Sequence, residues 1–246
     1  MQPYFFPYIG YFQLISAVDE FVLYDNIHYI TQGWINRNRI IQNKQAVMYF
    51  GIPVIGGSCS KKIYEIQADY NKVLRSKLLK ILRLNYRYSS FFDETYSMIE
   101  QALIGESDSI SEIDRHSILT IISHLDIRTK IQTDAFRFVD VEENLCKKYT
   151  SDCVEDEFGV NKKNQRVIWL CQKLGYHHYI NPNGGVELYS KELFAKNGIT
   201  LHFIKTLPYS YPQNMPGFTE HLSIIDVLMN CGKETTKEML LRHTLI

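Results

Sequence analysis

Apolar residues along the chain follow two periods, and the change from one to the other predicts a mixed α/β fold. Short β-branched and aromatic runs, such as Phe21–Tyr24 and Val47–Val54, are typical of strands. From Asp69 the apolar residues recur every three to four positions, as on one face of a helix. Both patterns return from Lys162 onward, in the order helix, strand, turn, helix, strand. We expect strands at residues 21–24, 47–54, 63–68, 127–133, 176–180 and 199–204, and helices at residues 11–18, 91–104, 109–124, 162–174, 188–197 and 223–229, with a further helix from residue 69.

The order of these elements predicts one α/β domain over residues 1–246, with a mainly parallel, Rossmann-like sheet. The strands at 47–54 and 63–68, joined by the polar turn Gly56–Lys62, favour an antiparallel hairpin. The helices between about residues 69 and 125 form a helical insertion. Residues 136–141 are expected to form a short strand or a loop, and residues 142–156 show no clear pattern. The last helix should end near Gly232.

The composition argues against several classes of protein. Lys plus Arg equals Asp plus Glu at 27 each, so no long-range field favours nucleic acid. No stretch of about twenty apolar residues is present, so we expect no membrane span. The first residues lack the basic and apolar segments of a signal peptide, so we expect a cytoplasmic protein.

The cysteines and histidines are too scattered to indicate a metal site or a disulfide framework. There are five cysteines, an odd number, and none forms a Cys-x-x-Cys pair. We therefore expect reduced thiols and no metal ligands. The cysteines are Cys59, Cys146, Cys153, Cys171 and Cys231.

Asp25 and His28 are the first candidates for chemistry, because they follow the strand Phe21–Tyr24. Ligand sites in open α/β sheets lie beyond the carboxyl ends of the strands. A carboxylate in hydrogen-bond reach of an imidazole raises the pKa of the imidazole and can make it a general base. Asp-x-x-His is a loose pattern, so an Asp that merely holds a turn stays open as an alternative.

Asn36, Arg37 and Asn38 place three multi-donor side chains in a row after Trp34. The guanidinium of Arg37 suits bidentate contact with carboxylate or phosphate, and the amides suit sugar hydroxyls. An exposed turn with an internal ion pair is the alternative. We favour ligand binding at these positions.

The turn Asn181-Pro-Asn183-Gly184-Gly185 lies between a predicted strand and a predicted helix. Backbone amides in such a turn favour anions, and Glu187 beside it could orient an amine or a hydroxyl. Further along the chain, Gln213 is a candidate for reading an amide. Ser223 and Asp226 could cap and orient the last helix, and His221 is expected to be an ordinary surface or core histidine.

The opening of the chain and several later motifs resemble the WbqC-like family, which occurs with bacterial surface-polysaccharide genes. Members of that family carry a Gln-Pro-x-x-x-Pro-x-x-Gly-Tyr/Phe opening, an Asp-x-Phe-Val-x-x-Asp strand and an Asn-Arg-Asn element. These stand here at Gln2–Tyr11, Asp19–Asp25 and Asn36–Asn38. The likeness continues through Pro53, the Tyr179–Gly185 turn, and Gln213, Phe218 and Ser223–Asp226, so it spans nearly the whole chain.

The same opening is distantly similar to the nucleotidylyltransferases, whose first strand is followed by Pro-x-His-x-Gly-His. Tyr8 and Tyr11 stand where the two histidines would fall. A tyrosine supplies only a neutral hydroxyl donor to a phosphate. This likeness keeps ATP with Mg²⁺ open as a cofactor, although the departure argues against nucleotidyl transfer by the histidine mechanism.

Members of the WbqC-like family usually carry a short apolar run before the Gln-Pro pair. Because this sequence begins beside that pair, we expect a further strand upstream of Met1 in the native gene product. Mass spectrometry of the native protein tests this expectation.

The WbqC-like resemblance implies a role in O-antigen and lipopolysaccharide assembly, where transfer of glycine onto an amino sugar has been suggested for the family. We therefore expect a transferase that adds an acyl or aminoacyl group to a nucleotide-linked amino sugar. Gln2, Asp25, Asn36–Asn38 and Asn181–Gly185 should converge at its site. An ATP-using nucleotidyl or adenylyl transferase and a non-catalytic sugar-nucleotide-binding protein stay open as alternatives, as does a homo-oligomer.

Overall fold

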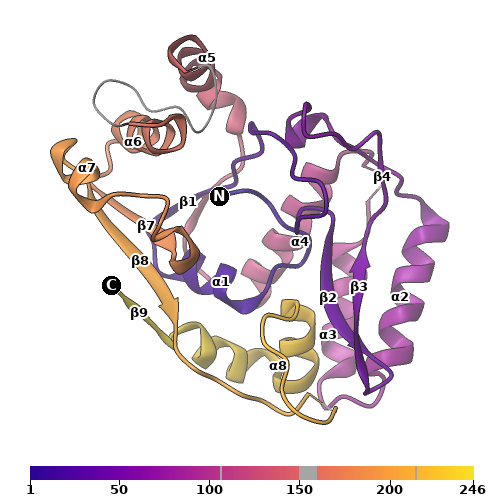
Figure 1. Ribbon diagram of the computed structural model, residues 1–246. Coiled ribbons are helices and arrows are strands. Elements are labelled where there is room, and N and C mark those ends of the chain that lie inside the picture. Colours follow the sequence, from indigo (N-terminus) through magenta and orange to yellow (C-terminus); the bar gives the residue numbers. More distant parts are fainter. Residues whose placement is uncertain (106, 150–159, 214) are drawn as a thin grey trace. The chain divides into compact units, whose positions relative to one another are not determined.

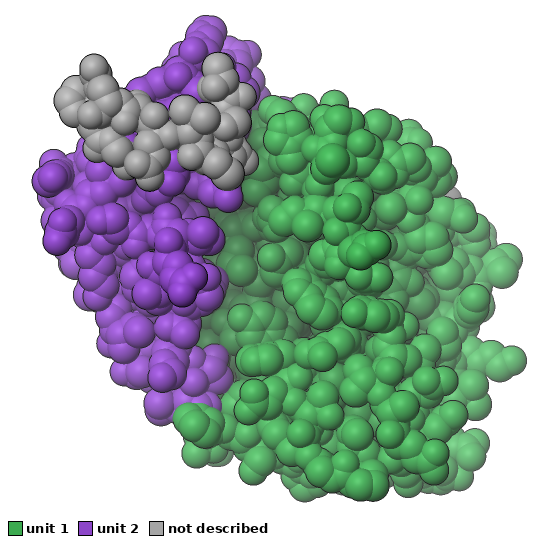
Figure 2. Space-filling view, viewed as in Figure 1, with its two compact units in different colours: residues 1–133, 208–242 green, residues 134–207, 243–246 purple. Residues whose placement is uncertain are grey.

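The computed structural model describes residues 1–105, 107–149, 160–213 and 215–246 (Figure 1). The chain divides into two compact units, coloured separately in Figure 2. Unit 1 comprises Met1–Thr133 and Pro208–Arg242, and unit 2 comprises Asp134–Leu207 and His243–Ile246. That the whole chain folds as one domain stays a prediction.

The helices of unit 1 begin at polar residues that satisfy the first backbone N–H groups. The side chain of Asn71 accepts hydrogen bonds from Val73 N and Leu74 N, and Ser109 Oγ accepts one from Glu112 N. The helices are α1 (Ile9–Ser16), α2 (Lys72–Tyr86), α3 (Phe92–Ala102), α4 (Ile110–His124) and α8 (Ile224–Leu240). Contacts run from α3 to both α4 and α8, and α1 also packs on α8. Helices α2, α3 and α4 lie in the stretch where helices of an insertion were expected.

Helix α8 extends beyond the predicted end near Gly232. Gly232 has φ 70°, which kinks the helix without ending it. A Cβ at this position would lie 2.5 Å from the ring of Phe91, so both the conformation and the space suit glycine. Gly232, from which the end of the helix was predicted, instead marks a kink within α8.

The strands of unit 1 form three two-stranded sheets within the described residues. β1 (Glu20–Val22) pairs in parallel with β6 (Lys130–Gln132), with Phe21 opposite Ile131. β2 (Arg37–Gln42) is antiparallel to β3 (Ala46–Gly51), and β4 (Val54–Ile55) to β5 (Gln67–Ala68).

The predicted pairing between residues 47–54 and 63–68 exists at the ends of these segments, where Val54 of β4 lies opposite Ala68 of β5. The rest of the first predicted strand has another partner. β3 pairs with β2, and the residues expected to pair with it begin with the 3-10 helix η1 (Ile63–Glu65). The sequence pattern did not predict β2, because the strand begins with the polar residues Arg-Asn-Arg. The buried residue among these three is Asn38, which carries an amide where a strand usually has an apolar side chain.

Unit 2 contains a three-stranded sheet in the order β7-β8-β9. β7 (His178–Pro182) is parallel to β8 (Thr200–Thr206), which is antiparallel to β9 (His243–Leu245). Its helices are η2 (Ala135–Phe138), α5 (Val139–Lys148), α6 (Lys162–Leu174), η3 (Asn183–Gly185) and α7 (Lys191–Lys196).

Residues 136–141, expected as a strand or a loop, are the end of η2 and the start of α5. Asp134 accepts a hydrogen bond from Phe136 N and so begins the helical turn. The unassigned stretch 142–156 is helical up to Lys148, and residues 150–156 lie outside the described part of the chain. Helix α6 has its predicted bounds, with Asn161 as N-cap and Gly175 in the left-handed conformation after it.

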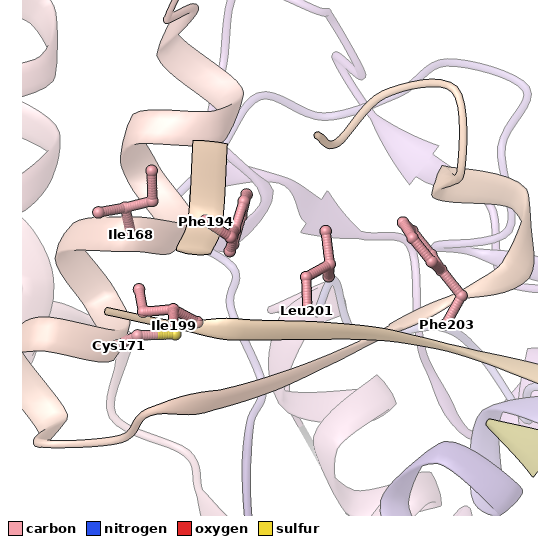
Figure 3. Packing of buried hydrophobic residues seen from close by; sticks show 6 residues of the cluster. All are labelled: Ile168, Cys171, Phe194, Ile199, Leu201 and Phe203. Carbon is pink, nitrogen blue, oxygen red and sulfur yellow. The ribbon is translucent and has the colours of Figure 1, made fainter. Parts of the chain in front are cut away.

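The core of unit 2 lies between α6, α7 and β8 (Figure 3). Phe194 of α7 is fully buried, and the ring of Tyr179 stacks on it with 5.9 Å between centroids. The cluster consists of Ile168, Cys171, Phe194, Ile199, Leu201 and Phe203. Burial raises the pKa of the Cys171 thiol to about 11, so it stays protonated.

The mixed α/β class is confirmed. Of the five strand pairings among the described residues, two are parallel and three antiparallel. The parallel pairing that we expected in one sheet is divided between two small sheets, β1–β6 and β7–β8–β9.

Candidate functional site

The N-terminal loop, residues 1–8, is held by hydrogen bonds to elements far away in sequence. Asn38 donates through Nδ2 to the carbonyl oxygens of Phe5 (3.3 Å) and Phe6 (2.9 Å). Ser223 donates to the same Phe6 oxygen at 2.7 Å. Phe6 has φ 41°, an unusual conformation for a bulky residue, and these bonds hold it there. The opening motif, the Asn-Arg-Asn motif and Ser223 therefore form one assembly.

Gln2 lies at the start of this loop. The hydroxyl of Tyr11 donates to the carbonyl oxygen of Gln2 at 2.8 Å, and the Gln2 side chain accepts from Tyr4 at 3.4 Å. On the other side, the backbone of Met1 pairs with Val22 and Tyr24 beside β1. Gln2 thus lies close to the residues that lead into Asp25.

Asp25 follows β1 and accepts a hydrogen bond from Ser111 on α4. Ser111 begins a polar stripe on this helix, which continues with Asp114 and Ser117 at three-residue spacing. All three side chains are buried, and the other buried residues of α4 are isoleucines. Ser117 Oγ accepts from Phe6 N at 3.5 Å. The stripe therefore runs from Asp25 to the N-terminal loop.

Asp114 is fully buried, and neither of its carboxyl oxygens has a hydrogen-bond partner among the described residues. Burial raises the pKa of this carboxyl well above its usual 3.8. Its charge in turn raises the pKa of Tyr11 and of Tyr29, each of which is shifted mainly by burial. A buried polar group without a partner costs about 1–3 kcal/mol. Native proteins keep few such groups, and a catalytic role or a bound water or ion can account for one.

Asn26 is a second buried residue with an unpartnered atom. Its Oδ1 accepts from Lys62 Nζ at 2.7 Å, whereas its Nδ2 has no partner among the described residues. His28 is exposed, and its backbone pairs with Lys62. The structure thus gives Asp25 a serine partner in the interior and places the His28 side chain on the surface.

The Asn36–Asn38 motif serves mostly the backbone. Asn36 accepts from the Tyr29 hydroxyl at 2.9 Å and donates to the Ile52 carbonyl oxygen at 2.8 Å. Arg37 donates to the carbonyl oxygens of Gln32 (2.6 Å) and Gly33 (3.3 Å), and its guanidinium lies 4.3 Å from the Tyr49 ring centroid. These two bonds use two of the five N–H donors of Arg37.

Tyr8 and Tyr11 are neutral phenols in this fold. Tyr11 is 1% exposed, and burial raises its pKa well above 10. Burial also raises the pKa of Tyr8, whose ring lies edge-to-face on His221 at 5.4 Å. Neither phenol supplies the positive charge that the nucleotidylyltransferase histidines bring to a phosphate.

Asp226 lies at the start of α8 and accepts hydrogen bonds from the hydroxyls of Tyr86 and Tyr211, each at 2.7 Å. Burial raises the pKa of this carboxyl to about 6. Gln213 closes the preceding loop by two bonds of 2.7 Å with the backbone of Thr219. Gln213 and Asp226 are therefore occupied within the protein.

The Asn181–Gly185 turn belongs to unit 2. Asn181 Oδ1 accepts from Tyr179 at 2.9 Å, and its Nδ2 donates to the Pro182 carbonyl oxygen at 3.0 Å. Gly185 packs against the Asn181 amide, while Asn183, Gly184 and Glu187 are exposed. Convergence of this turn with the motifs of unit 1 stays a prediction.

The chain matches the model of the WbqC-like protein family over residues 2–238. It belongs to this family. It is also similar to "Uncharacterized protein Rv1507c" of Mycobacterium tuberculosis (strain ATCC 25618 / H37Rv), with 26% identity over 237 residues, covering 95% of this chain and 93% of the relative. No solved structure is significantly similar to the chain.

Three of the motifs that mark this WbqC-like chain meet in unit 1, around the polar stripe of α4. Asp114, the centre of that stripe, was missed by sequence reasoning. Its signal is an acidic residue on an isoleucine-rich helical face, at a position where the helical period predicts an apolar side chain.

Other features of the chain bear on cofactors and partners. Within the described ranges, no three His, Cys, Asp or Glu side chains are grouped so that they could hold a metal ion. No helix in those ranges is long and apolar enough to cross a membrane. The described cysteines carry free thiols, and Cys153 lies outside the described residues.

A hollow of about 690 Å³ lies between α3 and α4. Glu94, His116 and His124 are among its lining residues, and neither Asp25 nor Asp114 lines it.

Proposed function

We propose that this WbqC-like protein is a transferase of surface-polysaccharide biosynthesis that adds an acyl or aminoacyl group, glycyl being the leading candidate, to a nucleotide-linked amino sugar. Membership of the WbqC-like family supports the assignment to surface-polysaccharide biosynthesis. The observation that carries the chemistry is Asp25, which is half-buried at the end of β1 and hydrogen-bonded to Ser111 amid the family motifs.

Asp25 accepts a proton in this proposal. An amino sugar is protonated near neutral pH, and its nitrogen attacks only after the ammonium has lost a proton. The amine then forms a bond to the acyl carbon, and the bond from that carbon to its activating group breaks. Ser111 orients the carboxylate through its hydrogen bond.

The binding residues of the proposal are those that the sequence indicated. Arg37 retains N–H donors beyond those bound to the backbone, and we assign them to a phosphate of the donor or acceptor. Gln2, next to Tyr11, contributes its side-chain amide to the sugar.

Mass spectrometry of reaction mixtures tests the proposal. The protein is incubated with nucleotide-linked amino sugars and with glycine plus ATP, glycyl-tRNA or acyl-thioester donors. We expect one donor to add its acyl mass to the sugar, and Asp25→Asn to abolish the product while the protein stays folded. Asp93→Asn, an exposed aspartate in α3, is the matched control. Sugar binding without product under every donor would instead indicate a non-catalytic sugar-nucleotide-binding protein.

A further inference from the structure

Asp114 is a residue to which neither the family motifs nor the proposed proton transfer at Asp25 assigns a role. It lies in the middle of the polar stripe of α4, one helical turn from Ser111 and one from Ser117. Both neighbours point to definite partners: Ser111 donates to Asp25, and Ser117 donates to the carbonyl oxygen of Asp114 itself. The carboxyl between them has no partner among the described residues.

The tyrosines near Asp114 do not satisfy it. Tyr11 and Tyr29 are close enough for its charge to raise their pKa values. The hydroxyl of Tyr11, however, donates to the Gln2 carbonyl oxygen, and that of Tyr29 donates to Asn36 Oδ1. Each hydroxyl has one proton, so neither is left for Asp114. The carboxyl lies among donors that are already used.

A carboxyl with two unpartnered oxygens is suited to a group that brings several donors and a positive charge. A primary ammonium has three N–H donors and no acceptor, so it can satisfy both oxygens. A metal ion is less suited, because no three ligating side chains are grouped within the described ranges. The half-buried Asp25 adjoins the same stripe through its hydrogen bond with Ser111.

We propose that the Asp114 carboxyl binds a primary ammonium group of the substrate. This inference rests on the proposed function in that the ammonium comes from the acceptor amino sugar or from the amino acid that is transferred. Asp114 holds the amine-bearing group, and Asp25, nearer the surface, accepts the proton.

The test is calorimetric titration with two probes that differ only at the nitrogen, UDP-glucosamine and UDP-N-acetylglucosamine. A charge-assisted hydrogen bond predicts that the free amine binds about tenfold or more tightly than the acetamide. Asp114→Asn, nearly the same size, should remove this preference. Ser117→Ala, on the same stripe, should keep it, and thermal unfolding shows that each variant is folded.

Glycine is the second probe and identifies the source of the ammonium. Glycine binding that disappears in Asp114→Asn, with equal affinities for the two sugar nucleotides, assigns the site to the amino acid. Equal affinities together with no Asp114-dependent binding of glycine would overturn the proposal, as would an amine preference that survives in Asp114→Asn.

Proton release gives a readout from the wild-type protein alone. Burial raises the pKa of the Asp114 carboxyl, and a bound ammonium would lower that pKa again, so binding should release protons, measured in buffers of different ionisation heat. Binding of the free amine without proton release contradicts the proposal. Product formation with an amine preference independent of Asp114 would refute the amine site and leave the transferase intact. Asp114-dependent binding without any product would support the amine site and refute the transferase.

Discussion

Replacing Asp226 by Asn should change how the stability of the protein depends on pH. Burial raises the pKa of Asp226 from its usual 3.8 to about 6, even though Tyr86 and Tyr211 donate to it. A carboxyl whose pKa is higher in the folded state stabilises the fold while protonated, and this contribution is lost as the pH rises from about 4 to about 6. The pKa difference corresponds to about 3 kcal/mol.

Asparagine keeps the shape of the side chain but has no charge to lose. Its amide oxygen can accept from one tyrosine, and its amide can donate to the other. The free energy of unfolding of Asp226→Asn, minus that of the wild type, should therefore rise by about 3 kcal/mol between about pH 4 and pH 8. Subtracting the two curves removes the titration of other groups that the substitution leaves unaltered.

Urea unfolding followed by circular dichroism at a series of pH values measures this difference. Asp126→Asn is the control of opposite sign, because hydrogen bonds from Lys233 and Lys237 lower the pKa of the exposed Asp126. That variant should lose stability relative to the wild type as the pH rises. A difference curve for Asp226→Asn that is flat across this range would refute the reasoning about burial.

Three further substitutions test individual contacts by chemical denaturation. Asn38→Ala removes the donor to two loop carbonyls and should destabilise the protein by about 2–3 kcal/mol; a loss below 0.5 kcal/mol (roughly the size of a surface effect) would show that the loop is held elsewhere. Gly185→Ala places a Cβ 1.9 Å from the Asn181 amide and should cost about 1–3 kcal/mol, whereas Gly184→Ala meets nothing within 4 Å and should cost less. Glu142→Gln breaks the paired contacts with Arg166 (2.6 and 3.1 Å) and should cost about 3–5 kcal/mol, and a neutral result would mean that the pair is not buried in solution.

Local signals in the sequence predicted many of the helices. Helix α6 is an example, because Asn161 before it and Gly175 after it are a favoured N-cap and a favoured C-terminal glycine. Strand β2 was missed for the opposite reason. Its inward Asn38 is satisfied by carbonyls more than thirty residues away, and no local pattern reports such a partner.

The candidate site shows the same limit. Asp25 could be located from the end of a strand, and the structure brings it together with the opening motif. Asp114 had only a weak signal, an acidic residue on an isoleucine-rich helical face, and its complete burial makes that signal decisive. Arg37 and Asn36 looked like ligand-binding residues, yet much of their hydrogen bonding goes to the protein itself. Motif residues of the types that bind ligands can therefore serve to hold the protein backbone in place.

Hydrogen exchange on adding a nucleotide-linked amino sugar tests the central claim most directly. The account predicts slower exchange in three segments of unit 1: the N-terminal loop, the residues around Asp25, and the first two turns of α4. Asp25→Asn and Asp114→Asn should weaken this protection. Protection confined to the outer hollow between α3 and α4, with the N-terminal loop and Asp25 unchanged, would contradict the account.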